Sequence, residues 1–225
     1  MVYVFERIDV IGAGRGELLE MLRSRLAPHL EEEYGIRLVG TWATVGSTGR
    51  WPEADALWEM DDWAHFARAQ SARFPLEERD PLSCEIARHS LGLRSGVRRD
   101  LLVSAAFSPS RERIRAERRE GPVVVRELVE ARPGDLGAYH AAVEAELVPL
   151  ARSRGAALLG CYAHALRPNR GLALWSYPSW EDLARAMETA LLDDEMASWE
   201  RRRDELLRDV EASLMARPPA RRLGT

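Results

Sequence analysis

The chain of 225 residues contains no lysine, because all 32 of its basic residues are arginine. Schiff-base lysine chemistry and the phosphate-binding lysine of a Walker-type loop are therefore excluded. The two cysteines, Cys84 and Cys161, are too few for a disulfide framework or a zinc site, and we expect both to be buried thiols. The formal net charge is only −4 with acids and bases interspersed, so neither nucleic acid nor a membrane surface is expected as a partner.

Long hydrophobic runs are also missing. No stretch approaches the roughly 20 apolar residues of a membrane span. The first residues carry charge at Glu6 and Arg7 and have no extended apolar core, which argues against a signal peptide. These absences predict a cytoplasmic protein without a membrane partner.

An internal repeat is the strongest positive signal. The segments 57–69 and 174–186 match at six of thirteen positions, with Leu-Trp at the start and Ala-Arg-Ala at the end. Each copy predicts a strand, a turn and then a helix that begins at a second tryptophan. A chain of this length that repeats itself favours two similar domains of about 100 residues each.

Both halves show the same order of elements. In the first half the patterns predict strands at 2–8, 36–45, 54–60 and 100–107, a helix from Glu17 to Gly35, and a helix from Trp63 toward Arg99 with a break at 75–81. A loop at 46–49 joins the middle strands. In the second half the predicted strands are 123–130, 157–166, 172–177 and 210–215, and the predicted helices are 135–154 and 179–208.

This order is β-α-β-β-α-β in each half, the ferredoxin-like unit of an α+β fold. The predicted boundaries are residues 1–109, a charged linker at 110–121 forming a solvated helical turn, residues 122–217, and a tail at 218–225. Each sheet would leave one face bare, so the two sheets are expected to face each other and close into a barrel within the chain. The first strand alternates Val4 and Glu6 with Phe5 and Arg7, so both faces are mixed and the pattern does not show which one lines the barrel.

Short motifs in both halves resemble the NIPSNAP family within the dimeric α/β-barrel superfamily, as two tandem copies. The motifs are Leu38-Val39-Gly40-Thr41-Trp42, Ala56-Leu57-Trp58-Glu59-Met60 and Ala106-Phe107-Ser108-Pro109, then Arg132-Pro133-Gly134, Leu159-Gly160-Cys161-Tyr162 and Leu174-Trp175-Ser176-Tyr177. The resemblance implies a superfamily that includes cofactor-independent monooxygenases, polyketide cyclases, isomerases and haem enzymes, with ligands commonly held in the barrel. The haem-peroxidase motif G-x-x-D-G is absent, so haem is not expected.

No cofactor or metal is expected from the remaining motifs. The loop Gly12-Ala13-Gly14-Arg15-Gly16 opens a helix, but Glu17 stands where a dinucleotide-binding loop needs its third glycine. The five histidines show no spacing typical of a metal site. His164 is the one histidine predicted on a strand.

Glu6 and Glu127 are the first candidates for chemistry. Each is a carboxylate in the middle of an apolar strand, at equivalent places in the two halves, where it needs a partner. The alternatives are a salt bridge to a strand arginine such as Arg7 or Arg126, and a catalytic role. Trp58 and Trp175 recur in the same way, which favours core packing, and both are retained as candidates for substrate contact.

A single ligand inside a barrel requires an asymmetric site, so positions that differ between the halves are the second source of candidates. Phe5 corresponds to Arg126, Trp42 to Tyr162 and Thr44 to His164. Tyr162 and His164 could donate a hydrogen bond and accept a proton, Arg126 could hold an anion, and Trp42 could supply a stacking wall. On this hypothesis His164→Ala and Arg126→Ala weaken ligand binding or turnover and leave thermal unfolding nearly unchanged.

Two functions fit the sequence. The first is a small-molecule enzyme of secondary metabolism, a cofactor-independent oxygenase, isomerase or cyclase acting on an aromatic or polyketide-like ligand. The second is a non-catalytic ligand-binding or protein-interaction barrel. A continuous pocket joining Trp42, Tyr162, His164 and a buried carboxylate would favour the first. The sequence leaves a homo-oligomer open.

Overall fold

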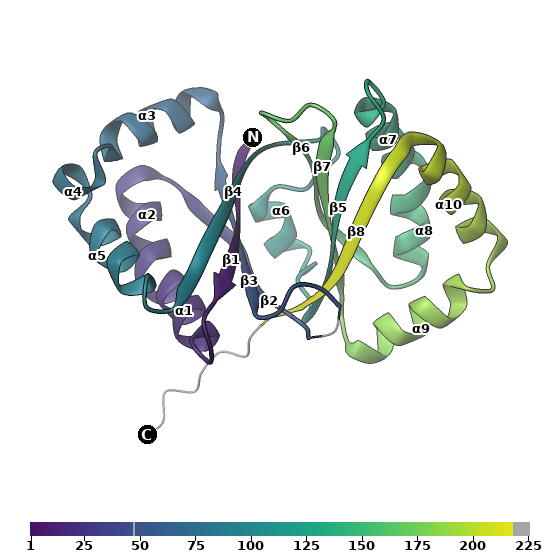
Figure 1. The fold of residues 1–225 in the computed structure, drawn as a ribbon. Coiled ribbons are helices and arrows are strands. Elements are labelled where there is room, and N and C mark those ends of the chain that lie inside the picture. The colour runs from purple at the N-terminus through teal and green to yellow at the C-terminus, as the bar shows by residue number, and fades with distance from the viewer. Residues whose placement is uncertain (47, 218–225) are drawn as a thin grey trace.

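The computed structural model describes residues 1–46 and 48–217, and in it eight strands close into one barrel with helices on two opposite sides (Figure 1). Ser47 of the predicted loop and the predicted tail 218–225 lie outside the described residues. No helix in the described ranges is long and apolar enough to cross a membrane.

The first half follows the predicted order, with extra breaks in its helices. Its elements are β1 (Val2–Val10), α1 (Arg15–Met21), the π-helical turn η1 (Leu22–Leu26), α2 (Ala27–Tyr34), β2 (Arg37–Thr44), β3 (Glu53–Met60), α3 (Trp63–Arg73), α4 (Leu76–Arg79), α5 (Pro81–Ser90) and β4 (Arg94–Ser104). β4 begins before the predicted Asp100, because its polar first part pairs along the whole of β1 as far as Val10.

The linker helix α6 (Arg111–Ala116) leads into a second half of the same design. Its elements are β5 (Val123–Ala131), α7 (Leu136–Ala142), η2 (Val143–Leu147), α8 (Val148–Ser153), β6 (Ala157–His164), β7 (Arg170–Tyr177), α9 (Trp180–Ala190), α10 (Asp194–Leu206) and β8 (Leu207–Ala216). The predicted single helix 179–208 is divided, because the Asp193 carboxylate accepts hydrogen bonds from the backbone N–H groups of Glu195 and Met196 and so starts α10.

The strands are ordered β1-β3-β2-β8-β5-β7-β6-β4 around the barrel. Within each half the neighbouring strands pair antiparallel, and two antiparallel seams join the halves: β2 pairs with β8 through Ala43 and Thr44, and β4 with β6 through residues 102–104. The predicted fold, two ferredoxin-like units forming a dimeric α/β-barrel within one chain, is confirmed.

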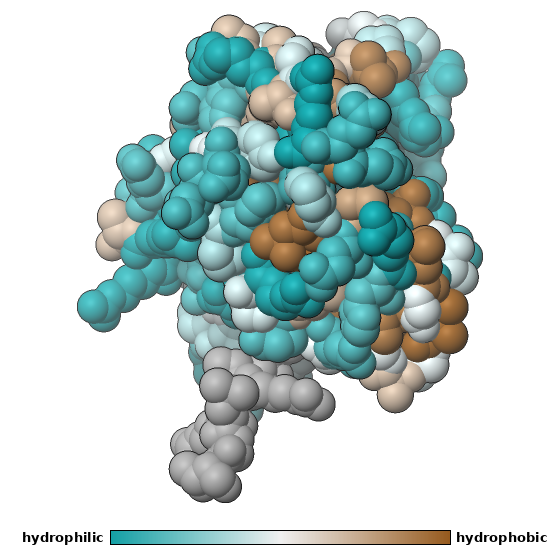
Figure 2. Space-filling view, turned by 90° about the vertical axis from the view of Figure 1, so that its left-hand side faces the viewer, coloured by the Kyte–Doolittle hydropathy of each residue, from teal (hydrophilic) through white to brown (hydrophobic). Residues whose placement is uncertain are grey.

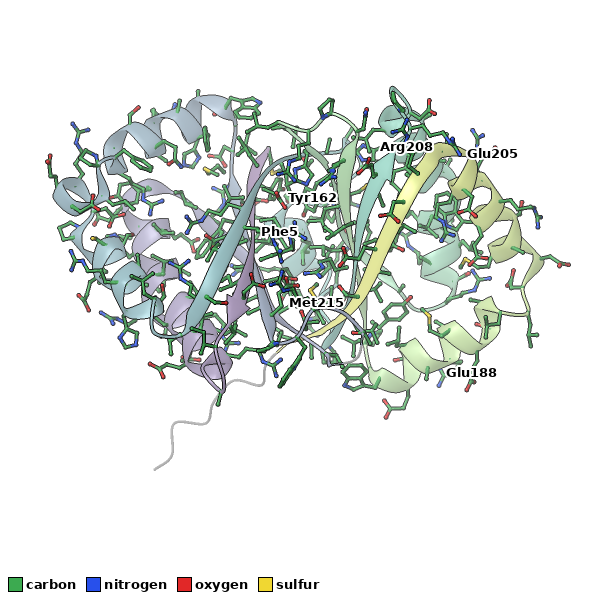
Figure 3. All side chains as sticks on the ribbon, in the orientation of Figure 1. Phe5, Tyr162, Glu188, Glu205, Arg208 and Met215 are labelled. Atoms are coloured by element: carbon green, nitrogen blue, oxygen red, sulfur yellow. The ribbon has the colours of Figure 1, made fainter. Side chains whose placement is uncertain are left out.

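The two faces of each sheet have different surroundings, which resolves the ambiguity of the first strand. Tyr3 and Phe5 belong to the cluster inside the barrel, whereas Val2, Val4 and Ile8 pack against the helices. Figure 3 shows Phe5, Tyr162 and Met215 in the space between the two half-barrels. Glu6 therefore faces the helices and Arg7 the interior.

Two glycines allow aromatic rings to fill the interior. Trp42 lies against Gly40 and Tyr162 lies against Gly160, at bulges in β2 and β6. A Cβ atom at either glycine would overlap the neighbouring ring. These glycines are therefore needed for close approach of ring and backbone.

The linker closes one end of the barrel. Ile114 of α6 is 1% exposed and belongs to the interior cluster. Arg111 donates two hydrogen bonds to the Glu31 carboxylate at 2.8 and 3.0 Å and a third to the Leu38 carbonyl at 3.0 Å. The segment was expected to be a solvated helical turn; it is helical, but its inner side is buried because it covers apolar residues between the half-barrels (Figure 1).

Candidate functional site

The eight candidate residues fall into two sets according to the face of the sheet they occupy. Trp42, Arg126, Tyr162 and His164 point into the barrel, whereas Glu6, Trp58, Glu127 and Trp175 lie on the faces covered by helices. The structure therefore brings each set together and separates the two sets by the thickness of a sheet.

The aromatic part of the interior is closely packed. The rings of Tyr3 and Tyr162 meet edge to face with their centroids 4.8 Å apart, and Trp42 lies in the same buried cluster. Burial raises the pKa of both tyrosines well above the usual value. Trp42 and Tyr162 are not among the lining residues of the cavities described below.

Arg126, predicted to hold a ligand anion, already has two anions of the chain as partners. Its side chain is 1% exposed, and its Nη1 donates hydrogen bonds to Glu53 at 2.9 Å and Asp55 at 2.7 Å. Both carboxylates come from β3, on the opposite half-barrel. Burial raises the pKa of Asp55 to about 7, against the lowering effect of the Arg126 charge and with a further increase from Glu53.

Asp55 gives the stability of the fold a pH dependence of defined sign. Because its native pKa of about 7 lies above the ordinary 3.8, the folded state binds this proton more tightly than the unfolded chain. The contribution to the free energy of unfolding is therefore full below pH 3.8, decreases as pH rises through about 7, and is constant above that. At roughly 1.4 kcal/mol per pKa unit, the decrease is on the order of 4 kcal/mol.

We expect Asp55→Asn to remove this decrease, as measured by urea unfolding between about pH 5 and pH 8. Asp61→Asn is the matched control, since Asp61 is mostly exposed and its pKa is lowered by the hydrogen bond from Arg37, so it titrates below this range. Equal slopes in wild type and Asp55→Asn would contradict the assignment.

His164 lies apart from the aromatic cluster, at the end of the barrel opposite α6. Its Nε2 is 3.8 Å from the Asp100 carboxylate, and it lines a polar cavity of about 200 Å³ together with Arg7 and Glu130. Burial lowers the pKa of His164, although the Asp100 charge raises it. The lowered pKa favours the neutral imidazole, in a cavity whose lining also includes arginines and carboxylates.

In the second set, each glutamate is bound to the tryptophan of its own half. The Trp58 indole N–H donates to Glu6 at 3.0 Å, and the Trp175 indole N–H donates to Glu127 at 2.9 Å. This pairing explains why glutamate and tryptophan recur together in the sequence, because the carboxylate and the indole N–H satisfy each other under the helices. The proposed partners Arg7 and Arg126 lie on the opposite face; the arginine that reaches Glu6 is Arg99, at 2.5 Å.

A cavity of about 330 Å³ adjoins this pair in the first half. It lies between the sheet and helices α2, α3 and α4, and its polar lining residues are Glu6, Trp58, Gln70, Arg73 and Arg99. The rest of the lining is apolar: Val4, Leu26, Leu30, Ile36, Met60, Phe66, Phe74, Leu76 and Leu101. Figure 2 views the helices of this half from outside and shows a mainly hydrophilic surface with small hydrophobic groups. The combination of apolar walls with a few polar groups is typical of small-molecule sites.

Around Glu127 the second half carries larger aromatic side chains. Glu6 and Glu127, like the starts of η1 and η2, are 121 positions apart, so Leu18 corresponds to Tyr139. Tyr139 and Trp199 are buried with their ring centroids 6.3 Å apart, in the same cluster as Trp175. Burial raises the pKa of Glu127, and the Trp175 hydrogen bond partly offsets this increase.

Gln70, Arg73 and Arg99 were missed by the sequence reasoning. Each stands in a helix or strand whose pattern reads as a solvated face, and no motif marks them. The sequence could have pointed to them through a difference between the halves, because Met187 and Ala190 occupy the places of Gln70 and Arg73 in the second half. Among residues 1–46 and 48–217, no group of three His, Cys, Asp or Glu side chains could hold a metal ion.

Searches with family models and against curated proteins gave no match. Solved structures do match over most of the chain. A proposed monooxygenase from Lactobacillus acidophilus is 9% identical, with a TM-score of 0.64 over 96% of this chain and 92% of that one. An anthrone oxidase-like protein is 8% identical, with a TM-score of 0.62 over 96% and 90%. A NIPSNAP domain protein from Burkholderia xenovorans is 20% identical, covers 49% of this chain with all of its own, and has a TM-score of 0.39.

At these identities the likeness defines the fold: the chain is a dimeric α/β-barrel protein with both halves in one polypeptide. The matches to NIPSNAP proteins cover 44 to 49% of the chain.

Proposed function

We propose that the chain is a small-molecule enzyme that binds a mainly apolar ligand in the cavity of the first half and uses Glu6 as the proton acceptor. The observation that carries the proposal is the 330 Å³ cavity with a carboxylate in an otherwise mostly apolar wall. Its volume lies in the range of ligand pockets. An origin as two NIPSNAP-like copies, a role in secondary metabolism, and an aromatic or polyketide-like ligand are parts of the same proposal.

Oxygenation, isomerisation and cyclisation of such molecules share a first step, the removal of a proton from a carbon or oxygen acid. A carboxylate held in place beside an apolar ligand is suited to that step. The Trp58 N–H and the Arg99 guanidinium orient the two oxygens of Glu6, at 3.0 and 2.5 Å. None of the three reactions requires lysine, metal or nucleotide.

The steps of an oxygenation can be written for an anthrone, the class of compound in the name of one structural neighbour. Glu6 accepts the proton of the ring CH2 group, and the carbanion adds to dioxygen from solution to form a C–O bond. The peroxide anion takes the proton back from Glu6, and the hydroperoxide loses water to give the anthraquinone carbonyl. One dioxygen is consumed and one water is released.

The alternative is a non-catalytic ligand-binding barrel. It is supported by the fact that both oxygens of Glu6 already accept hydrogen bonds from the chain. A ligand would then occupy the cavity without proton transfer.

Blocking the cavity tests the binding step that both alternatives share. Leu101 of β4 lines the cavity opposite Val4, and Leu214 of β8 holds the same place opposite Val125. We expect Leu101→Trp to weaken binding of anthrone, or of related bicyclic and tricyclic phenols and ketones, at least about tenfold in equilibrium dialysis, since an indole would occupy the ligand's space.

Leu214→Trp is the control and should leave the affinity unchanged, with thermal unfolding followed for both variants. Equal affinities of wild type and Leu101→Trp would place the ligand elsewhere and contradict the proposal. Appearance of anthraquinone with uptake of dioxygen distinguishes turnover from binding alone.

A further inference from the structure

Three arginines line two adjoining cavities of the first half. Arg73 and Arg99 line it, and both also line an adjoining cavity of about 90 Å³, where Arg94 joins them. The two cavities share five lining residues: Glu6, Leu26, Arg73, Leu76 and Arg99. Glu6 is the carboxylate among the lining residues of both.

The charges in this region do not balance. Glu6 pairs with Arg99, and Asp80 pairs with Arg73 through its Nε at 2.9 Å. Arg94 donates through Nε to the Ser90 hydroxyl at 2.8 Å and has no carboxylate partner among the described residues. One guanidinium charge is therefore left uncompensated, in a protein whose net charge is −4. Burial and the charge of Arg99 lower the pKa of Arg94, in agreement with an excess of positive charge.

Hydrogen-bonding capacity is unbalanced in the same direction. A guanidinium carries five N–H donors. Arg73 uses Nε and Nη2, on Asp80 and Ser83, and Arg94 and Arg99 each use Nε alone. Both oxygens of Glu6 are already occupied. The region therefore offers several donors and lacks a free carboxylate acceptor.

The second half has none of these cations. Ala212 stands opposite Glu127 where Arg99 stands opposite Glu6, and Leu207 pairs with Ala131 where Arg94 pairs with Val10. Ala190 ends α9 as Arg73 ends α3. The basic cluster is thus not required for this fold to form, because the equivalent half folds with apolar residues at all three places.

We infer that the ligand of the first half is an organic acid, whose apolar body fills the 330 Å³ cavity and whose anionic oxygen group, a carboxylate or an ionised phenol or enol, points to Arg73, Arg94 and Arg99. The inference rests on the proposed function for the location of the ligand and adds its chemical class. Arginine recognises carboxylates through paired N–H groups, and such charge-assisted bonds are stronger than neutral ones.

The test compares two probes of nearly equal shape, 2-naphthoate and its neutral amide 2-naphthamide, by titration calorimetry with the full chain. We expect the acid to bind at least about tenfold more tightly than the amide, and to weaken as salt is added. Arg94→Leu, which introduces the residue of the second half, should reduce the affinity for the acid about tenfold and leave that for the amide unchanged.

Arg208→Leu is the control for net charge, because Arg208 lies on the exposed side of β8, away from the cavity (Figure 3). If Arg94→Leu does not fold, the inference is tested by how the wild-type affinities for the acid and the amide change with salt concentration. Equal affinities for acid and amide would overturn the inference and leave the proposed function standing. If neither probe binds, the result contradicts the inference and the proposed function together.

Discussion

Replacing Glu6 with glutamine should lower the turnover of a ligand of the first cavity by at least about a hundredfold and change its dissociation constant little. Glutamine keeps the shape of the side chain and can still accept the hydrogen bond from Trp58, but it cannot take up a proton at neutral pH. Positioned acid–base groups contribute about 10²–10⁴ in rate, which sets the expected size of the effect. The measurement is kcat and Kd for the same ligand.

The second half supplies the control for this variant. Glu127→Gln changes the same residue type, in the same strand position, beside an equivalent tryptophan. It should leave kcat unchanged, because Glu127 does not line the cavity of the first half. If both variants lose activity equally, Glu6 acts through the fold and not on the ligand. If the wild type binds a ligand without converting it, the non-catalytic alternative is supported.

Arg126→Ala should destabilise the fold by about 3–5 kcal/mol, because it leaves Glu53 and Asp55 buried without their shared cation. This differs from the expectation based on the sequence, in which the variant changes ligand binding and spares thermal unfolding. The measurement is the free energy of unfolding in urea at neutral pH.

His164→Ala is the comparison, since the His164 Nε2 lies 3.8 Å from the Asp100 carboxylate and the side chain borders a cavity. It should cost about 1 kcal/mol or less. If Arg126→Ala unfolds the chain completely, the double variant Arg126→Met/Asp55→Asn should recover part of the stability, because fewer charges then remain unpaired. A loss below about 1 kcal/mol for Arg126→Ala would show that the buried cluster is not structural.

The architecture could be predicted from the sequence because the evidence for it is periodic and repeated. The tryptophans at 58 and 175 and the glutamates at 6 and 127 recur in the same order, and each pair turned out to be a hydrogen bond between neighbouring strands. A repeated pair of residues reports a contact that both halves need. The repeated pairs therefore indicated how the fold is held together and did not mark a single functional site.

The face that lines the barrel could not be predicted, because β1 carries Glu6 on one side and Arg7 on the other. Which of these charges is tolerated depends on partners far away in the chain. Glu6 is matched by Arg99 and Arg126 by Asp55, residues 93 and 71 positions away. The cavity was hidden for the same reason: Arg73 and Arg99 come from a helix and a strand with no shared pattern, and only the closed fold places them together.

The linker helix α6 has a consequence beyond covering the end of the barrel. In a barrel built from two identical chains, every substitution appears twice, so a residue that improves one site is also imposed on the other. Here Ile114 is buried between half-barrels that belong to one polypeptide. A change at Arg94 is therefore inherited without a change at Leu207, and one half can specialise in chemistry while the other retains only the residues that keep the sheet and its helices packed.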